Sequence, residues 1–384
     1  MAKWNYVKIG DVCTVERGGS PRPIDKFITD DPNGINWIKI GDATDSMYIT
    51  ETAQKIIPEG MKKSRYVQPG DFLLSNSMSF GRPYILKIDG CIHDGWLVLR
   101  DNGGVFDKRF LYYCLSSPST YQKFKNMAVG GVVNNLNSDM VRGVTVPIPK
   151  MEEQIEIVQT LDNVSNLIFL RKQQLAKLDE LVKARFIELF GDQTANPYAW
   201  QQTSIGACCT LKSGTSLPAD KENEGGAIPY VKVGDMNYPG NEQYITTSSR
   251  FVSEQTAGTG VFPVGTVIFP KRGGAIGTNK KRLTRLPICA DLNVMGVTAG
   301  RRLTPQYLMA YFNTVDLGTL NNGSSVPQIN NKDIAPLLIC IPPMALQEPF
   351  AAFVEQVDKS KAAVQKALDE AQLLFDSLMQ KYFG

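Results

Sequence analysis

The chain repeats one domain-sized unit in tandem. The segment Trp37-Ile-Lys-Ile-Gly-Asp42 returns as Tyr230-Val-Lys-Val-Gly-Asp235, an offset of 193 residues. At the same offset both copies end on Phe-Gly, at Phe190-Gly191 and Phe383-Gly384. A period this long exceeds the 20–50 residues of a solenoid repeat and matches the size of an ordinary domain. The sequence therefore predicts two similar units and a function that uses both.

The composition is that of an ordinary globular protein, with 43% hydrophobic and 21% charged residues and a formal net charge of +3. We expect no signal peptide and no membrane span, because the chain begins polar and no apolar run approaches the roughly 18 residues of a spanning helix. The seven cysteines include no C-x-x-C pair, which favours a reducing cytoplasm and cysteines buried as small apolar residues. With so small a net charge, any nucleic-acid surface must be local.

The sequence predicts no catalytic residues and no metal site. His93 is the single histidine, so two-histidine zinc sites are excluded, and we expect it to make a local hydrogen bond in its turn. The glycine-rich run Gly273–Gly277 lacks the Lys-Ser/Thr that follows it in a phosphate-binding loop. No Glu-x-Lys triplet of the restriction-nuclease type occurs, and no Asn-Pro-Pro-aromatic run of the amino-methyltransferase type.

Each globular part is a mixture of strands and short helices. Alternating or apolar runs bounded by turn residues predict strands at 72–75, 84–88 and 96–99, and a short helix at 108–115. Thr145–Pro149 should be extended, because its two prolines exclude a helix. In the second copy, residues 266–269 repeat the strand at 72–75.

Two long helices follow the globular parts, over 151–190 and from about Pro349 to Tyr382. Apolar residues recur every seventh position, which is typical of a coiled-coil seam. The expected core residues are Leu161, Ile168, Leu175, Val182, Leu189, Val354, Val357, Val364, Leu368, Phe375 and Leu378.

A helix of about 40 residues with an apolar stripe needs a packing partner, and spans roughly 60 Å. The simplest partner is its own repeat in an antiparallel coiled coil with pseudo-two-fold symmetry; the alternative is that each helix folds back on its own domain. We therefore predict an α+β fold with two domains, 1–149 and 193–342, and two helical spacers, 150–192 and 343–384.

With these features the chain resembles the DNA-specificity (S) subunits of type I restriction–modification systems. The resemblance covers essentially the whole chain. It is carried by Trp4 with Ile9–Asp11, by Trp37–Asp42, by Val146-Pro-Ile-Pro-Lys-Met-Glu-Glu-Gln154, and by Glu188–Asp192 with Asn196–Trp200.

The resemblance implies a non-catalytic subunit in which each target-recognition domain reads one half of a bipartite, asymmetric double-stranded DNA site. It implies that the coiled coil spaces the domains and docks two methyltransferase (M) subunits, and that restriction (R) subunits join the complex. It also implies that no cofactor belongs to this chain: S-adenosylmethionine would be held by the M subunits, and ATP and Mg²⁺ by the R subunits.

We expect polar loop residues to contact the DNA, because base edges are read by side chains while Lys and Arg on phosphates fix the register. The candidates are Ser20, Arg22, Asn76, Ser77, Ser79 and Arg82 in the first domain, and Thr215, Ser216, Lys271, Arg272, Asn279, Lys280 and Lys281 in the second. Each of them can instead be a turn residue that satisfies its own backbone. The segment from Lys271 to Arg285 combines polarity, flexibility and charge most strongly.

Two alternatives stay open. The chain can be the specificity chain of a related methylation-based phage-defence system, or a stand-alone two-domain nucleic-acid-binding scaffold. Weak DNA binding that rises sharply when an M subunit is added would argue against the scaffold.

Overall fold

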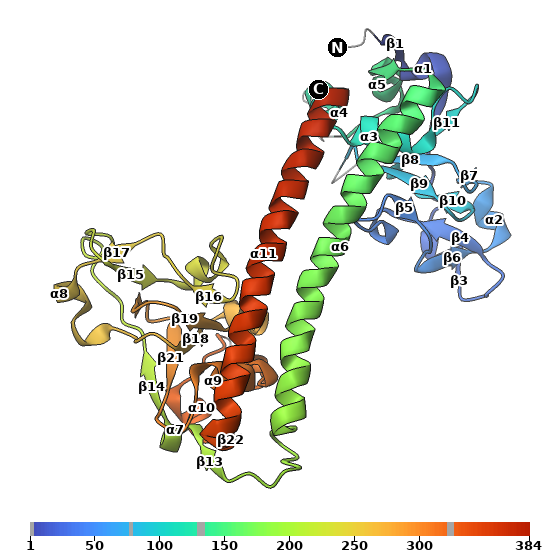
Figure 1. Ribbon diagram of the computed structural model, residues 1–384. Coiled ribbons are helices and arrows are strands. Elements are labelled where there is room, and N and C mark those ends of the chain that lie inside the picture. The colour runs from blue at the N-terminus through green and yellow to red at the C-terminus, as the bar shows by residue number, and fades with distance from the viewer. Residues whose placement is uncertain (1–3, 77–79, 129–134, 321–325) are drawn as a thin grey trace. The chain divides into compact units, whose positions relative to one another are not determined.

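The computed structural model describes residues 4–76, 80–128, 135–320 and 326–384. It divides into two compact units, of which the first joins Met1–Lys172 to Lys366–Gly384 and the second is the continuous segment Gln173–Gln365. Each unit contains one globular domain together with about half of each of two long helices, α6 (Met151–Phe190) and α11 (Met344–Phe383) (Figure 1).

The domain of the first unit is built on two five-stranded sheets and a two-stranded ribbon. Its strands are β1 (Asn5–Lys8), β2 (Cys13–Arg17), β3 (Ile28–Thr29), β4 (Ile35–Ile38), β5 (Tyr48–Ile49), β6 (Gln54–Ile56), β7 (Arg65–Val67), β8 (Phe72–Ser75), β9 (Pro83–Leu86), β10 (Gly90–Ile92), β11 (Trp96–Asp101) and β12 (Thr145–Ile148). The sheets have the orders β2-β11-β8-β9-β5 and β3-β6-β4-β10-β7, and β1 pairs with β12. The strands predicted at 72–75, 84–88 and 96–99 are the three central strands of the first of these sheets.

Strand β11 is apolar on both faces because both faces are covered. Leu97 and Leu99 belong to a core shared with the helices of the unit, whereas Trp96 and Val98 belong to a second core that includes strands of the other sheet. Successive strand residues point to opposite faces, so a continuous apolar run marks a strand between two layers. The helices are α1 (Ile9–Val12), α2 (Pro58–Met61), α3 (Lys108–Ser116), α4 (Pro118–Ala128) and α5 (Ser138–Gly143).

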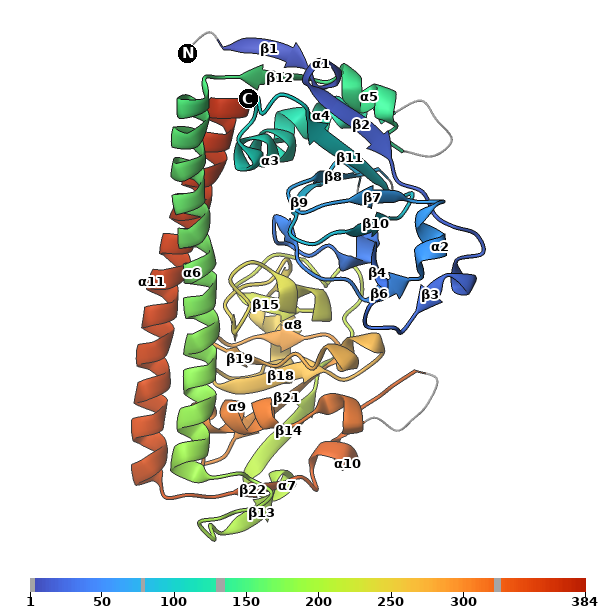
Figure 2. The same ribbon diagram turned by 90° about the vertical axis from the view of Figure 1, so that its right-hand side faces the viewer.

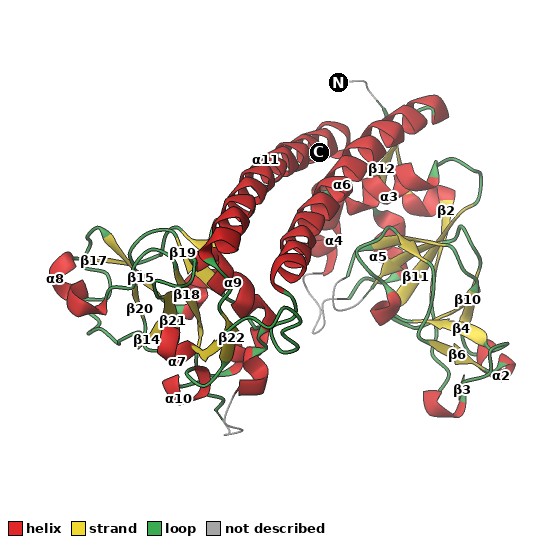
Figure 3. Ribbon diagram, turned by 60° about the horizontal axis from the view of Figure 1, so that its bottom comes forward, coloured by secondary structure: helices red, strands yellow, loops and turns green. Residues whose placement is uncertain are grey.

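The second unit repeats this topology in a shorter form. Its strands are β13 (Gln202–Ser204), β14 (Cys209–Ser213), β15 (Ile228–Val231), β16 (Tyr244–Ile245), β17 (Phe251–Val252), β18 (Thr266–Pro270), β19 (Arg282–Thr284), β20 (Cys289–Ala290), β21 (Val294–Ala299) and β22 (Leu338–Cys340). The helices are α7 (Ile205–Cys208), α8 (Glu254–Ala257), α9 (Pro305–Thr314) and α10 (Asn331–Ile334). The sheet β14-β21-β18-β19-β16 corresponds to β2-β11-β8-β9-β5, and β13 pairs with β22 as β1 pairs with β12. Figure 3 shows α9 beside the strands of this sheet.

The long helices pack against each other at their ends in both units. In the first unit the start of α6, with Ile157 and Leu161, shares a core with the end of α11, with Met379 and Phe383; these segments lie side by side in Figures 1 and 2. In the second unit the end of α6 shares a core with the start of α11, where the rings of Phe186 and Phe350 lie 5.7 Å apart. Because the start of one helix meets the end of the other, the two helices run antiparallel.

A buried glutamine in the first turns of α6 fixes the helix to the first domain. The side-chain oxygen of Gln154 accepts a hydrogen bond from the N–H of Asp107 at 2.9 Å. Its amide nitrogen donates to the carbonyl oxygens of Val105 at 2.9 Å and Pro149 at 3.1 Å. The amide therefore joins the helix start to the loop before α3.

Gln347 makes the same three bonds in α11. Its oxygen accepts from the N–H of Thr304 at 2.9 Å, and its nitrogen donates to the carbonyls of Arg302 at 2.9 Å and Pro342 at 2.8 Å. Both glutamines are fully buried. Glutamine is therefore repeated at an offset of 193 residues because both helix–domain junctions require the same buried amide.

The eleven residues predicted for the seam are all buried or half-buried. The sequence pattern missed the most buried residues of the end of α6, Phe186 and Phe190. These two rings pack on Tyr307 of the second domain as well as on Phe350. A helix end that packs on a domain and on a second helix buries a wider face than a seventh-residue repeat describes.

Lys361 lies seven residues after Val354 and seven before Leu368, so it interrupts the apolar seam, and it forms an ion pair there. Its ammonium binds the carboxylate of Asp179 on α6 and donates to the side-chain oxygen of Gln243 at 3.0 Å. The side chain is only 15% exposed, so the charge is largely removed from water and needs these partners.

The second long helix begins at Met344, so the expected start near Pro349 is wrong by five residues. The earlier start brings Gln347 into the first turns of the helix, from which it reaches its three partners. Pro349 and Ala345 are both exposed, so the carbonyl that the proline leaves unpaired can bind water. None of the helices in the described ranges combines the length and apolar character that a membrane span requires.

Candidate nucleic-acid interface

The same glycine turn follows the second strand of each domain. The N–H of Gly18 donates to the first residue of β11, and that of Gly214 to the first residue of β21, both at 2.9 Å. An added Cβ at Gly18 would lie 2.2 Å from the carbonyl oxygen of His93, and one at Gly214 would lie 2.1 Å from that of Asp291. Only glycine fits such an approach. The candidates that follow these glycines therefore start from equivalent places.

Asn76 and Lys271 also occupy equivalent positions, directly after β8 and β18. The N–H of Asn76 donates to the carbonyl of Gly95 at 2.9 Å, and that of Lys271 to the carbonyl of Asn293 at 2.8 Å. The carbonyl of each accepts a hydrogen bond from a residue two positions before a short helix, α5 or α10, at 2.9 and 2.8 Å. The backbone is thus the same in both domains while the side chain changes from an amide to an ammonium.

In the first domain the candidates Ser20, Arg22 and Asn76 meet around Asp94. Ser20 donates to one carboxylate oxygen at 2.8 Å, and Arg22 lies 3.5 Å from the other. The amide nitrogen of Asn76 donates to the backbone carbonyl of Asp94 at 2.9 Å, and so does Arg17 at 3.0 Å. We call these residues the Asp94 cluster.

Two members of this cluster differ in their access to a ligand. The side chain of Arg22 is 79% exposed, whereas Asn76 is only 1% exposed. Within the described residues, the side-chain oxygen of Asn76 has no hydrogen-bond partner. The arginine is therefore the group that can reach a phosphate, and the asparagine supports the turn.

His93 makes the local hydrogen bonds that were expected of it. Its Nδ1 accepts from the N–H of Gly95 at 2.9 Å, which leaves Nε2 to donate to Asp94 at 2.9 Å. Burial acts to raise the pKa of Asp94, but the hydroxyl of Ser20, His93 and the nearby arginines outweigh it and hold that pKa below its usual range. Asp94 is thus a fixed anion that positions the side chains around it.

A basic segment lies against the same turn. An added Cβ at Gly19 would lie 2.9 Å from the carbonyl oxygen of Lys63, so the 62–65 segment runs directly beside it. Arg65 is 44% exposed and pairs with Glu16 at 3.2 Å. The positive charges of Arg17, Arg22 and this segment therefore come together, as a phosphate-binding surface requires.

In the second domain Lys271 reaches back toward the glycine turn. Its ammonium donates to the hydroxyl of Ser213 at 2.9 Å, one residue before Gly214. Burial and the neighbouring charge of Arg272 lower the pKa of Lys271. Arg272 itself is exposed, as are Thr215 and Ser216.

Three other candidates of the second domain serve its own structure. Lys281 is only 5% exposed, and its ammonium donates to Asn279 at 2.7 Å and to the carbonyl of Val315 at 2.6 Å. Burial lowers the pKa of Lys281 to about 8. Asn279 also accepts from the N–H of Leu317 at 2.9 Å and holds a left-handed turn, and Lys280 bonds Asn237. The geometry thus favours a structural role for Asn279 and Lys281.

Arg285, at the end of the same basic segment, binds helix α11 instead of pointing to solvent. Its guanidinium lies 3.2 Å from the carboxylate of Asp358 and 3.8 Å from the ring centroid of Tyr244. Tyr244 and Gln243 bond the same carboxylate. This part of the segment joins the domain to the helix.

The remaining first-domain candidates lie in the β8–β9 connection. Arg82 is exposed, with its N–H bonded to the hydroxyl of Ser75 at 3.0 Å. Ser77 and Ser79 fall outside the described residues. Apart from the turn residues around Asp94, no sequence signal indicates its central role. In the ranges that the structure describes, no cluster of His, Cys, Asp and Glu has the arrangement of a metal site.

Comparisons with known proteins match both halves of the chain. The family model of the type I restriction modification DNA specificity domain matches residues 1–180 and again 197–372. The type I restriction enzyme MjaIX specificity subunit of Methanocaldococcus jannaschii is 23% identical over 98% of this chain and 92% of its own length.

Two solved structures share the fold over the whole chain. One is a chain from a study of complex assembly and conformational transition of the type I R-M system, with a TM-score of 0.62, 19% identity and 98% of that chain covered. The other is the type I restriction-modification S subunit from M. genitalium, with a TM-score of 0.59, 15% identity and 97% of it covered. Two repeated specificity domains of mixed helix and sheet are thus what this chain and its relatives share.

Proposed function

Because this chain belongs to the type I restriction modification DNA specificity family, we propose that it is the DNA specificity subunit of a type I restriction–modification complex, in which each domain reads one half of a bipartite site. The observation that carries the two-half proposal is that equivalent glycine turns, at Gly18 and Gly214, are followed by different exposed polar side chains. These are Arg22 in the first domain and Thr215 and Ser216 in the second. A common scaffold with different polar groups suits two half-sites of different sequence.

The DNA contacts in this proposal come from two groups of exposed residues. Arg22 with the 62–65 segment in the first domain, and Thr215 with Ser216 in the second, lie beside the equivalent glycine turns. Arg272 follows Lys271, whose ammonium bonds Ser213 just before the second of these turns. Exposed arginines bind phosphates and fix the register, and the adjoining hydroxyls are suited to base edges. Lys281 and Asn279 are left out of the proposed contacts because their polar groups are already engaged.

The reactions of the complex belong to its partners in this proposal. Two M subunits would dock on the paired helices and transfer a methyl group from S-adenosylmethionine to adenine, and R subunits would supply ATP- and Mg²⁺-dependent cleavage. This chain, a cytoplasmic protein in the proposal, supplies sequence choice and spacing. A span of roughly 60 Å for each helix accommodates half-sites about one DNA turn apart.

The proposal is tested by expressing the chain with its M subunit in a host that lacks modification and sequencing the adenine methylation. One gapped, two-part adenine motif is expected. A methylome without such a motif, although both proteins are present and soluble, would contradict the proposal.

The reading by halves is tested by exchanging residues 193–342 for the same segment of another specificity chain. We expect one half of the motif to change and the other half to stay. A motif altered in both halves would show that the domains do not read independently.

A further inference from the structure

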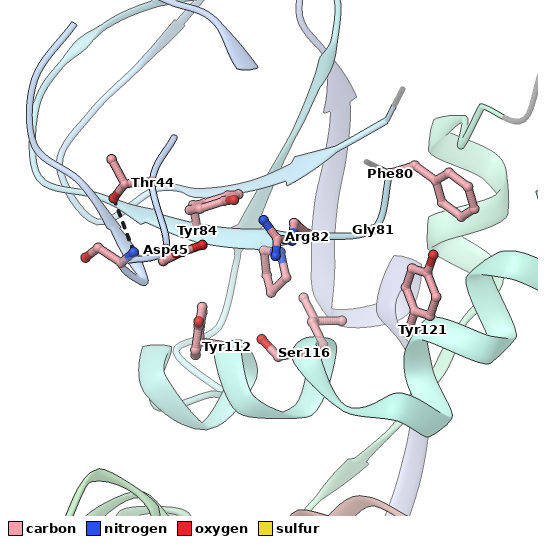
Figure 4. Close-up of a pocket in the computed structure, with 12 residues that line it drawn as sticks. Thr44, Asp45, Phe80, Gly81, Arg82, Tyr84, Tyr112, Ser116 and Tyr121 are labelled. Atoms are coloured by element: carbon pink, nitrogen blue, oxygen red, sulfur yellow. Dashed lines mark hydrogen bonds between the residues drawn. The ribbon is translucent and has the colours of Figure 1, made fainter. Parts of the chain in front are cut away.

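The first unit contains a cavity of about 380 Å³ beside the β8–β9 connection. Its walls come from three parts of the domain, namely residues 44–46, residues 80–84, and helices α3 and α4 (Figure 4). Cavities that hold small organic ligands start at about 300 Å³, so the space is sufficient for a mononucleotide-sized molecule.

Aromatic rings form much of the lining. Phe80 and Tyr121 are stacked, with ring centroids 5.9 Å apart and planes 19° apart. Tyr84 and Tyr112 contribute two further rings from β9 and α3. Tyr121 is 43% exposed, so its ring can accept a ligand without unfolding the helix that carries it. Stacked, partly exposed aromatic rings suit a planar ligand, because aromatic faces bind bases by stacking.

Charged and hydroxyl groups converge on the same space. The guanidinium of Arg82 is exposed and makes no ion pair with any residue of the described ranges. Burial raises the pKa of the Tyr112 hydroxyl, whereas Ser116 and the charge of Arg82 act to lower it. Ser116 and Arg82 therefore lie close to this hydroxyl. In Figure 4 Arg82 lies between Tyr84 above and Tyr112 and Ser116 below, with Asp45 on one side. An unpaired arginine beside aromatic rings suits a ligand that carries an anionic group on a planar ring.

The cavity and the Asp94 cluster lie on the same hairpin connection. Gly81 donates to the carbonyl of Ser75 at 2.7 Å and closes the base of the connection. From that base, Asn76 bonds Asp94, and Arg82 lines the cavity. The connection that carries Arg82 of the cavity therefore also carries Asn76 of the Asp94 cluster.

We propose that this cavity binds a nucleotide, with its base against the Phe80–Tyr121 stack and its phosphate on Arg82. The nucleotide can come from two sources, a free mononucleotide or a nucleotide of the bound DNA that has left the base stack. The second source rests on the proposed function, and the first does not.

The first arm of the test uses the full-length chain and 2-aminopurine 2′-deoxyriboside 5′-monophosphate, a fluorescent mononucleotide. Stacking on Phe80 and Tyr121 should quench its fluorescence saturably. We expect Tyr121→Ala to weaken binding of the mononucleotide about tenfold, which is within the range of one base–aromatic contact. Arg82→Gln should weaken binding of the mononucleotide more than it weakens binding of the nucleoside that lacks the phosphate. Tyr238→Ala and Arg301→Gln, which change exposed residues of the second unit, are the matched controls and should bind as the unaltered chain does.

The second arm uses the chain with its M subunit on duplexes that carry 5-iododeoxyuridine at single positions in and beside the first half-site. Irradiation should join the base at one position to Phe80 or Tyr121, as read by peptide mass spectrometry, if the source is the DNA. Quenching in the first arm without this cross-link would assign the cavity to free nucleotides. Neither quenching nor a cross-link, with all variants unfolding at the temperature of the unaltered chain, would overturn the proposal.

The two arms also separate this proposal from the proposed function. A chain that binds the mononucleotide but directs no gapped methylation keeps the cavity assignment and loses the specificity-subunit role. A chain that directs methylation at a bipartite motif but fails both arms keeps that role and loses the nucleotide site.

Discussion

Residues at equivalent positions of the two domains fall into two groups. Gln154 and Gln347, like Gly18 and Gly214, are identical because they make identical contacts. Asn76 and Lys271 differ although their backbones are held alike. The sequence repeat marked the first group directly. The second group could not be matched from sequence, because its members share no side chain.

Gln154→Ala should destabilise the first unit by about 2–3 kcal/mol, since it leaves the half-buried N–H of Asp107 and the carbonyl of Val105 without partners. Gln347→Ala should cost the second unit a similar amount. Urea unfolding of the full chain measures both. Gln159→Ala, an exposed change on α6, should leave the free energy of unfolding within about 0.5 kcal/mol. Equal stability of all three variants would show that the junction does not depend on these amides.

Arg272→Ala should weaken DNA binding about equally on all sequences and reduce the slope of log K against log salt concentration by about 1, because it removes one exposed phosphate contact. Binding of the chain with its M subunit at several salt concentrations provides the slope. Lys221→Ala is the control, since its ammonium already pairs with Glu224 at 3.0 Å. An unchanged slope in the Arg272 variant would remove this residue from the interface.

We expect Cys208 to be more reactive than the buried Cys13. Cys209 lies 3.7 Å from Cys208, and its hydrogen bond lowers the pKa of the Cys208 thiol, with help from the charge of Arg302 and against the effect of burial. Burial raises the pKa of Cys13 to about 12. Because the thiolate is the nucleophile, limiting iodoacetamide at pH 7.5 should modify Cys208 first, as seen by peptide mass spectrometry. Earlier modification of Cys13 would contradict this order.

Among the elements, the long helices were the most predictable. The pattern at 151–190 matches α6 at both ends, because Gly191 follows in the left-handed conformation that ends a helix. The start of α11 was predicted too late, because Pro349 indicates a helix start in the sequence although the helix begins five residues before it. The short strands were found where apolar runs were bounded by turns, but two-residue strands such as β5 and β16 carry no pattern of their own.

The helix ends carry more packing than the seam does. Phe190 is fully buried, and its ring lies 4.8 Å from that of Tyr307. Phe190→Ala should therefore lower the free energy of unfolding by about 3–5 kcal/mol. Ile187→Ala on the same helix removes a side chain that is 55% exposed and should change it by less than about 0.5 kcal/mol. Thermal and urea unfolding of the two variants compares them, and a larger loss for Ile187→Ala would place the packing face elsewhere.

At the scale of the whole molecule, the sequence predicted two repeated units and two long helices, and the structure has both. It did not predict that each compact unit combines one domain with parts of both helices. That division depends on contacts between residues far apart in the chain, such as Phe110 with Phe383, whose rings lie 5.4 Å apart. No local pattern records such a pair. The sequence likewise predicted the basic segment from Lys271 to Arg285 as a single DNA-contacting segment, whereas in the structure Arg285 binds α11.

Removing seven residues from the centre of both helices, 170–176 and 364–370, should shorten the spacer of the methylated motif by about 3 base pairs. The reason is that seven helical residues span about 10.5 Å and a base-pair step about 3.4 Å. Methylome sequencing measures the spacer. Replacing the same residues with another heptad of equal length should leave it unchanged. A shortened pair of helices that directs the original spacing would refute the role of the helices as a spacer.

The discontinuous first unit has a consequence for the order in which the protein is made. A ribosome completes the second unit, residues 173–365, while the last nineteen residues of the first are still to be translated. Phe383 reaches the core of the first unit only after the second unit has been translated. The domain that emerges first is thus the last to gain its full set of contacts. A premature stop near residue 365 would leave the later domain intact and the earlier one incomplete.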